Sequence, residues 1–331
     1  MASIRPFLFA AALPLTLVAC GGDGGTGPVT PEGEHYQQVA KKAYVPKSNT
    51  EARDFSIDLG SPDGTRDGVK DNQLGMVLST LASPQFGFDV QGTIDEAVAT
   101  GSIILLVDFQ TSSFESTKAA GLKVMLGDDA TATPAPCNVD EMWDETTMTG
   151  CGHHLTGSGN FTLAAGQPDN DAVTGAIAGG KFTGGPGELT LQIALGTTEA
   201  LTLNLIGARA EATGISATGI TSLILAGALT EEDLNTKVMP AIQQQITPLI
   251  AEDCTMLSSP PGCGCASGST GETILQLFDA DPKDCAVSVD EIKGNTLIQS
   301  LLAPDVKIDG VNALSLGIKV ETTTATFPAQ N

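Results

Sequence analysis

The stretch GELTLQIALG, residues 187–196, alternates apolar and polar side chains along its length. Its apolar residues from Leu189 to Leu195 lie two apart, so they share one face of an extended chain. The same period recurs in ALTLNLIG, residues 200–207, and in LSLGIKVE, residues 314–321. Alternation of this kind is typical of antiparallel strands with one buried face and one solvent-facing face. The chain is therefore expected to be mainly β.

Shorter apolar segments add further strands. Residues 103–109 form a nearly continuous apolar run, and residues 122–126 and 161–163 are shorter candidates. Glycine-rich breaks such as AGGKFTGGPG, residues 178–187, separate the segments as hairpin turns do. Many strands with few helices between them favour two packed sheets or one closed sheet. We predict an antiparallel β-sandwich or barrel, with a helix-loop-helix segment inserted before the last strand.

Two helices are expected between the strands. Residues 93–96, TIDE, have the spacing of a capping box, and a short helix from there is expected to end at Gly101. A longer helix is expected over residues 231–252, where the apolar residues fall on one stripe. Pro240 lies inside this helix and removes a backbone donor, so we expect a kink or a split near it.

The N-terminus has the features of an export signal. Arg5 precedes an apolar run over residues 6–18, which is too short to span a bilayer as a mature helix. The run leads into LVAC, residues 17–20, which resembles the lipobox of bacterial lipoproteins. The resemblance implies that residues 1–19 are a signal peptide and that Cys20 becomes the acylated N-terminus, with palmitate-type chains. It also implies a location in the bacterial cell envelope, anchored to a membrane through the lipid.

The residues after Cys20 refine this expectation. They are Gly21, Gly22 and Asp23, and the lack of an aspartate directly after the cysteine favours the outer membrane, on its periplasmic face or at the cell surface. Residues 20–50 include GGDGGTGPVTPEGE and show no apolar periodicity. They are expected to form the lipidated cysteine and a flexible tether.

The chain after the tether is long enough for a sizeable core. We expect a β-rich domain with short helices over residues 51–253. A disulfide-linked helix-loop-helix is expected over residues 254–331, with a final strand that returns to the sheet.

The charge balance narrows the choice of partners. The formal net charge is −23, from 16 Lys and Arg residues against 39 Asp and Glu residues. Phosphate binding needs a basic patch, so nucleic acid is not expected as a partner. The acidic excess suits a solvated surface or sites for cations.

The cysteines indicate disulfides. Of the seven cysteines, six remain when the lipidated Cys20 is set aside, and an even number in an exported chain is typical of paired cysteines. Cys137 and Cys151 stand apart from the others and are expected to pair with each other. Cys263 and Cys265 flank a single glycine, so a bond between them would be strained. Each is therefore expected to pair with Cys254 or Cys285, in either order.

FDADPKDCAVSVDEI, residues 278–292, resembles the calcium loop of an EF-hand. Such a loop binds calcium through oxygens at fixed positions, with glycine at position 6 and a bidentate glutamate at position 12. Counting twelve residues from Asp279 puts Lys283 among the ligands, which would repel the ion. We prefer the register that puts Glu291 at position 12, with one residue looped out.

In the preferred register, the resemblance makes four carboxylates the calcium ligands: Asp279, Asp281, Asp284 and Glu291. Cys285 then stands where the EF-hand has glycine, although cysteine is strained at positive φ. A disulfide from Cys285 could hold the loop in place of the ion. We therefore expect a loop that keeps the EF-hand outline and has lost tight calcium binding.

A second acidic segment is DGTRDGVKDN, residues 63–72. Asp63, Asp67 and Asp71 lie four residues apart beside glycines, and the pattern resembles the aspartate-rich calcium repeats of thrombospondin type 3. The resemblance implies calcium as a ligand of these three carboxylates. The alternative is a polar turn that caps a helix starting near Asn72.

Three functions remain open, and a hydrolase without a recognisable motif is placed last among them. The chain has none of the short motifs of zinc hydrolases, serine hydrolases or P-loop proteins, so we do not expect an enzyme. The first hypothesis is a calcium-associated lipoprotein that binds another macromolecule or supports the envelope. The alternative is a carrier of an apolar ligand, held in a cavity between the sheet and the helix of residues 231–252. A continuous apolar cavity would favour the carrier.

Overall fold

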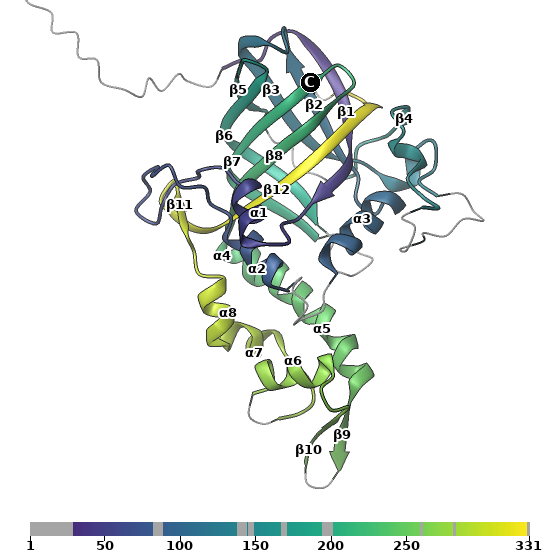
Figure 1. The fold of residues 1–331 in the computed structure, drawn as a ribbon, viewed down its shortest axis with the longest axis vertical. Coiled ribbons are helices and arrows are strands. Elements are labelled where there is room, and N and C mark those ends of the chain that lie inside the picture. The colour runs from purple at the N-terminus through teal and green to yellow at the C-terminus, as the bar shows by residue number, and fades with distance from the viewer. Residues whose placement is uncertain are drawn as a thin grey trace, which may run out of the picture.

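The larger end of the molecule is a curved sheet, and the smaller end is a group of helices with a hairpin at its tip (Figure 1). The expected signal peptide and Cys20 lie outside the part of the chain that can be described. The computed structural model describes residues 29–81, 89–137, 144, 149–166, 171–193, 201–258, 261–280 and 283–329.

The strands of the sheet close on themselves. Those that follow one another around it are β1 (Glu34–Tyr44), β2 (Leu105–Thr111), β3 (Ser116–Leu126), β5 (Val173–Ala178), β6 (Lys181–Ile193), β7 (Leu201–Ser216), β8 (Gly219–Thr230) and β12 (Val311–Thr326). Because β1 pairs with both β2 and β12, these eight antiparallel strands form a closed barrel. The expected mainly β, antiparallel fold is confirmed.

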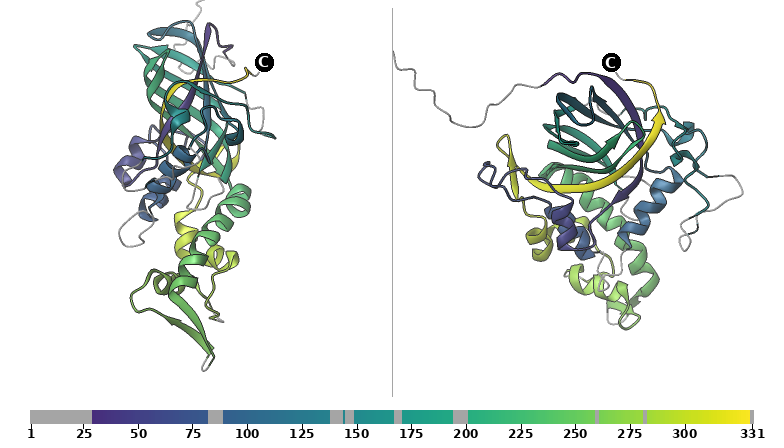
Figure 2. Two further views of the ribbon diagram at one scale, coloured as in Figure 1. Left: turned by 90° about the vertical axis from the view of Figure 1, so that its right-hand side faces the viewer. Right: turned by 45° about the horizontal axis from the view of Figure 1, so that its top comes forward.

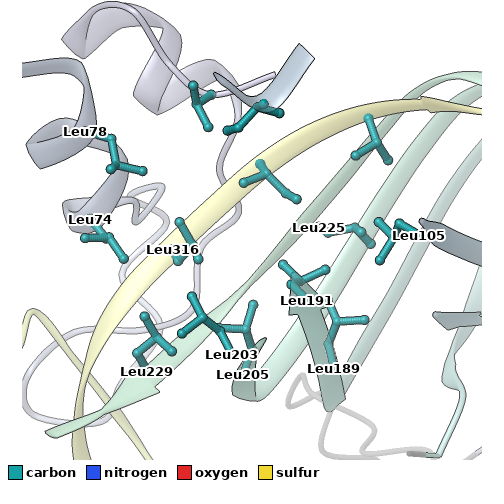
Figure 3. Close-up of a cluster of buried hydrophobic side chains, with 14 of the residues drawn as sticks. Leu74, Leu78, Leu105, Leu189, Leu191, Leu203, Leu205, Leu225, Leu229 and Leu316 are labelled. Carbon is teal, nitrogen blue, oxygen red and sulfur yellow. The ribbon is translucent and has the colours of Figure 1, made fainter. Parts of the chain in front are cut away.

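Leucine side chains from many strands fill the barrel. Leu189 and Leu191 on β6 gather with Leu203 and Leu205 on β7 and with Leu316 on β12 (Figure 3). These are the apolar positions of the alternating stretches, and each is at most 2% exposed. The alternation therefore marks the inner face of the barrel, as expected from the period of a strand.

Two aromatic rings complete the interior. Phe109 on β2 and Phe182 on β6 are both fully buried. Their ring centroids lie 5.2 Å apart with an interplanar angle of 85°, which is the edge-to-face arrangement that aromatic pairs prefer. The barrel interior is thus a packed core.

Residues with positive φ form two of the hairpin turns. Gly179 (φ 57°) and Gly180 (φ 73°) join β5 to β6. Asp309 (φ 49°) and Gly310 (φ 85°) join β11 (Val306–Ile308) to β12. Two-residue hairpin turns with positive φ at both positions favour glycine, asparagine and aspartate, so the local sequence suits each turn.

The tether prediction is wrong for residues 34–50. Glu34–Tyr44 form β1, which lies between β2 and β12, and Asn49 begins the helix α1 (Asn49–Asp54). The segment lacks an apolar alternation because its inward-facing Gln38, which is fully buried, is satisfied by a polar partner. Its Oε1 accepts a hydrogen bond from Thr322 Oγ1 on β12. Strand pairing on both sides then satisfies the backbone of a segment that reads as polar.

Two further helices pack against the barrel, α2 (Gln73–Leu81) and α3 (Val90–Thr100). The helix expected from Thr93 begins three residues earlier, because Asp89 caps it by accepting a hydrogen bond from Gly92 N. It ends at Gly101, which has φ 81° and is the expected C-cap. The predicted start of this helix is therefore wrong, and its predicted end at Gly101 is confirmed.

The C-terminal helices extend away from the barrel (Figure 2). The elements of this C-terminal part, in chain order, are α4 (Glu231–Asp233), a π-helical turn (Leu234–Val238), α5 (Met239–Asp253), β9 (Cys254–Ser258), β10 (Pro261–Cys265), α6 (Thr270–Phe278), α7 (Val289–Gly294) and α8 (Thr296–Leu301).

No helix among the residues that the structure describes is both long and apolar enough to cross a membrane.

The π-helical turn lies just before Pro240. Pro240 is the second residue of α5, and its missing N–H removes a backbone donor from the helical segment that runs on from α4 through this turn. The expected irregularity near Pro240 is therefore present as a π turn in a continuous helical segment.

The expected strand at residues 161–163 is reduced to a single bridge between Leu163 and Gly127, while β4 (Gly159–Asn160) pairs with β12.

The six cysteines other than Cys20 form three disulfides: Cys137 with Cys151, Cys254 with Cys265, and Cys263 with Cys285. The first pair is the expected one. The other two settle the order that the sequence left open. Cys254 and Cys265 face each other across the β9–β10 hairpin, so this bond closes the base of the hairpin, and Cys263 is free to reach Cys285.

Candidate functional site

The EF-hand-like loop is closed by bonds within the protein. Cys285 has φ 62°, the conformation for which an EF-hand uses glycine, and it is bonded to Cys263. A side chain at positive φ is strained. The disulfide holds Cys285 in this conformation and ties the loop to the β9–β10 hairpin.

Glu291, the expected bidentate ligand, binds backbone and hydroxyl donors. Its Oε2 accepts hydrogen bonds from Ser288 N at 2.7 Å and Ser288 Oγ at 2.8 Å, and its Oε1 accepts one from Ala280 N at 2.9 Å. Together with Ser288 it forms the capping box of α7. Burial opposes ionisation of Glu291, but the hydrogen bonds from Ser288 and Ala280 outweigh it and hold its pKa below the usual value.

The described aspartates of this loop, Asp279 and Asp284, accept hydrogen bonds from the backbone. Asp279 is 7% exposed, and burial raises its pKa, partly offset by hydrogen bonds from the Asp284 and Cys285 backbone. Asp284 Oδ1 accepts a hydrogen bond from Ala286 N. Asp281 lies outside the described residues. Within the described ranges, no group of three or more His, Cys, Asp or Glu residues is placed to hold a metal ion.

The aspartates of the second acidic segment each serve a different turn. Asp63 Oδ1 accepts hydrogen bonds from Ser61 Oγ, Thr65 Oγ1 and Thr65 N, and the pKa of Asp63 falls to about 2 because of them. Asp67 Oδ1 accepts a hydrogen bond from Val69 N at 2.8 Å. These are the bonds of short polar turns.

Asp71 faces inward instead. Its Oδ2 accepts hydrogen bonds from Leu59 N at 2.7 Å and Gly60 N at 3.3 Å. Burial, together with the nearby Asp305 and Asp58 carboxylates, raises the pKa of Asp71 to about 6 against the effect of these bonds. Asp71 is therefore only partly ionised near pH 6.

Asn72 confirms the alternative interpretation of this segment as a helix cap. Its Oδ1 accepts a hydrogen bond from Gly75 N at 3.0 Å at the start of α2. The same side chain bonds both the N–H and the C=O of Gly317 on β12, through Oδ1 and Nδ2. Asn72 therefore fixes α2 on the outside of the barrel.

One cavity in the helical end is apolar and has a volume of about 200 Å³. Four helices supply most of its wall: α2, α5, α6 and α8. Thr80 and Gln245 are the polar members of the lining, and none of the residues described there is charged. The lining residues are Leu74, Val77, Leu78, Thr80, Val90, Val238, Ile242, Gln245, Ile246, Ile274, Leu277, Phe278, Leu297, Ile298, Leu301 and Leu302.

This cavity differs in one respect from the one expected. It lies against the helix of residues 231–252, but its other described walls are helices, and none of its lining residues belongs to a strand of the barrel. One part of the wall has a signal in the sequence, since Leu74, Val77 and Leu78 in α2 have the i, i+3, i+4 spacing of one helix face. The contact of α2 with helices more than 150 residues away could not be read from that spacing.

The two polar residues of the lining differ in their bonding. Thr80 Oγ1 donates a hydrogen bond to Met76 O at 2.9 Å, within α2. Gln245 Nε2 is buried and has no hydrogen-bond partner among the described residues. The surface that lines the cavity is therefore entirely apolar.

Comparison of the chain with family models, with curated proteins and with solved structures gave no match.

Proposed function

We propose that the protein is a lipid-anchored binding protein of the bacterial cell envelope that carries a small apolar ligand between its α2, α5, α6 and α8 helices. The observation that carries the proposal is the cavity of about 200 Å³ whose lining is apolar apart from Thr80 and Gln245. Ligand sites are typically concave, largely apolar and equipped with a small number of polar groups. This arrangement favours the carrier over the calcium-associated alternative, for which the described residues offer no ligand group.

Apolar burial supplies the binding energy in this proposal. Each methylene group that moves from water into the cavity contributes about 0.8 kcal/mol, which is roughly a fourfold gain in affinity. Ligand affinity is therefore expected to rise with chain length until the cavity is full and to level off afterwards.

The test is a fluorescence titration of the chain from residue 21 onward with the apolar dye N-phenyl-1-naphthylamine. Leu277 is half-buried and lines the cavity, so Leu277→Trp places an indole in the space that the dye would occupy. We expect this variant to bind the dye at least about tenfold more weakly, because the apolar volume is lost.

Val311→Trp is the matched control, because Val311 is 47% exposed on β12 and is not part of the cavity wall. It is expected to bind the dye as the wild type does. Saturable binding that is equal in all three proteins would show that the dye binds elsewhere, and the proposal would be wrong.

A further inference from the structure

A second cleft, with a volume of about 320 Å³, lies where the barrel meets the helical end. Strands β8 and β12 contribute to one side of it, and α4, the π-helical turn, α5, α7 and α8 contribute to the other. Unlike the apolar cavity, it has a surface that is part polar and part apolar. The two spaces have Ile298 and Leu302 in common among their described lining residues. The volume falls within the range of about 300–1,000 Å³ that is typical of small-molecule sites.

The apolar part of this cleft comes from buried side chains. Leu234 in the π-helical turn, Met239 in α5 and Leu314 on β12 line it, and each is at most 7% exposed. The π-helical turn also contributes the polar Asn235. Single π-helical turns are rare and occur frequently at functional sites. The arrangement suits a ligand that has an apolar part and polar groups.

Two side chains of opposite charge line the same cleft. Glu231 in α4 is exposed and Lys293 in α7 is half-buried. Neither side chain forms an ion pair or a hydrogen bond within the part of the chain that the structure describes. Lys237, in the π-helical turn and outside the cleft lining, is by contrast paired with Asp233, Nζ to Oδ1 2.8 Å. The cleft therefore offers one carboxylate and one ammonium that can each bind an opposite charge on a ligand.

We infer that this cleft binds a small zwitterion with an apolar side chain, which is the chemistry of an apolar amino acid or a short apolar peptide. Glu231 binds the ammonium of the ligand, and Lys293 binds its carboxylate. The apolar side chain of the ligand is buried against Leu234, Met239 and Leu314. This site is separate from the apolar cavity, so the inference does not rest on the proposed function.

The charges explain why a zwitterion is expected. A ligand with a negative charge alone would face the Glu231 carboxylate, and a ligand with a positive charge alone would face the Lys293 ammonium. Like charges repel each other, so either ligand would gain from one side chain and lose from the other. A ligand that carries both charges can satisfy both side chains at once.

The test is isothermal titration calorimetry of the chain from residue 21 onward at pH 7.5, with L-leucine and with the dipeptide leucyl-leucine. Saturable binding of either ligand supports the inference, and the tighter of the two identifies the source as an amino acid or a peptide. If neither ligand binds at millimolar concentrations, the inference is wrong.

Charge-neutral variants and ligand analogues test each contact separately. Glu231→Gln is expected to weaken the tighter zwitterion about fivefold, the upper end for an ion pair that stays partly exposed. It is expected to leave the N-acetyl analogue unchanged, because that analogue lacks the ammonium. Lys293→Gln is expected to weaken the zwitterion by a similar factor and to leave the C-terminal amide analogue unchanged, because that analogue lacks the carboxylate. Each comparison is a double-mutant cycle, which isolates the contact from effects on folding.

Glu232→Gln and Lys283→Gln are the matched controls, because both residues are exposed and neither lines the cleft. Both variants are expected to bind as the wild type does. If Glu231→Gln weakens the zwitterion and its N-acetyl analogue equally, Glu231 does not bind the ammonium and the inference fails. Displacement of N-phenyl-1-naphthylamine by the zwitterion would place the ligand in the apolar cavity and would also overturn the inference. A failure of the wild type to bind the dye bears on the proposed function alone.

Discussion

His154 is a buried imidazole that no described residue bonds. It is fully buried against Phe161, with ring centroids 6.0 Å apart, and neither of its ring nitrogens has a hydrogen-bond partner among the described residues. Burial, with a smaller contribution from the neighbouring His153, lowers the pKa of His154 from 6.5 to about 4. The folded protein therefore holds this ring neutral where the unfolded chain would protonate it.

The sign of the pH effect follows from these two pKa values. Between pH 6.5 and about 4 the unfolded state binds more protons at this residue, so stability falls as the pH falls through this window. The expected loss between pH 7.5 and pH 5 is about 2 kcal/mol for this residue alone. Urea unfolding of the wild type and of His154→Leu at both pH values measures it. An equal pH dependence in the two proteins would contradict the neutral, buried state of His154.

At the scale of the element, the EF-hand-like segment shows what can replace an ion. Its two devices are the Cys263–Cys285 disulfide and the Glu291 carboxylate, which bonds Ser288 and Ala280. Both connect parts of the loop that calcium would otherwise draw together. Removal of a native disulfide from a small exported domain typically costs about 2–5 kcal/mol.

Hydrogen exchange over residues 273–302 tests this interpretation. In the wild type we expect the same protection with calcium and with chelator. In Cys263→Ala/Cys285→Gly we expect lower protection, because the bond is gone even though glycine suits φ 62°. Calcium is not expected to restore it. Protection that depends on calcium in either protein would mean that the loop still works as an EF-hand.

Most strands were predictable because their apolar residues alternate, as on β6 and β12, where the inner face of the barrel is leucine-rich. β1 was missed because burial of its Gln38 depends on Thr322, nearly 300 residues away. The loop that carries Cys285 was predictable in outline, since the cysteine stands at the glycine position. The pairing of Cys263 with Cys285 was not predictable, because it depends on the β9–β10 hairpin that brings Cys254 to Cys265.

In the whole molecule, the packed barrel and the helices around the cavity have different roles in the proposed function. The barrel interior is filled by side chains such as Phe109 and Phe182, so it serves as a scaffold. The apolar cavity lies among helices from two distant parts of the chain, α2 and the segment from α5 to α8. The apolar faces of α2 and α5 can each be read from the sequence, but their meeting around one cavity depends on tertiary packing and could not.

The proposed lipid anchor places this molecule at a membrane, where apolar ligands are available. Cys20→Ser removes the residue that the lipobox resemblance makes the acylation site. We expect the variant to accumulate as an unprocessed precursor or to leave the membrane fraction, because stable anchoring needs several acyl chains. Cell fractionation followed by mass determination of the N-terminus measures this. A variant that is processed normally and remains in the membrane fraction would contradict the proposed anchor.

Native mass spectrometry of the chain from residue 21 onward, mixed with 1-decanol, measures directly whether the helical cavity binds an apolar ligand. We expect a one-to-one adduct in the wild type and in Val311→Trp, and little or none in Leu277→Trp, whose indole fills the cavity. The absence of an adduct from the wild type, or an equal adduct in Leu277→Trp, would contradict the claim that the helical cavity is a ligand site.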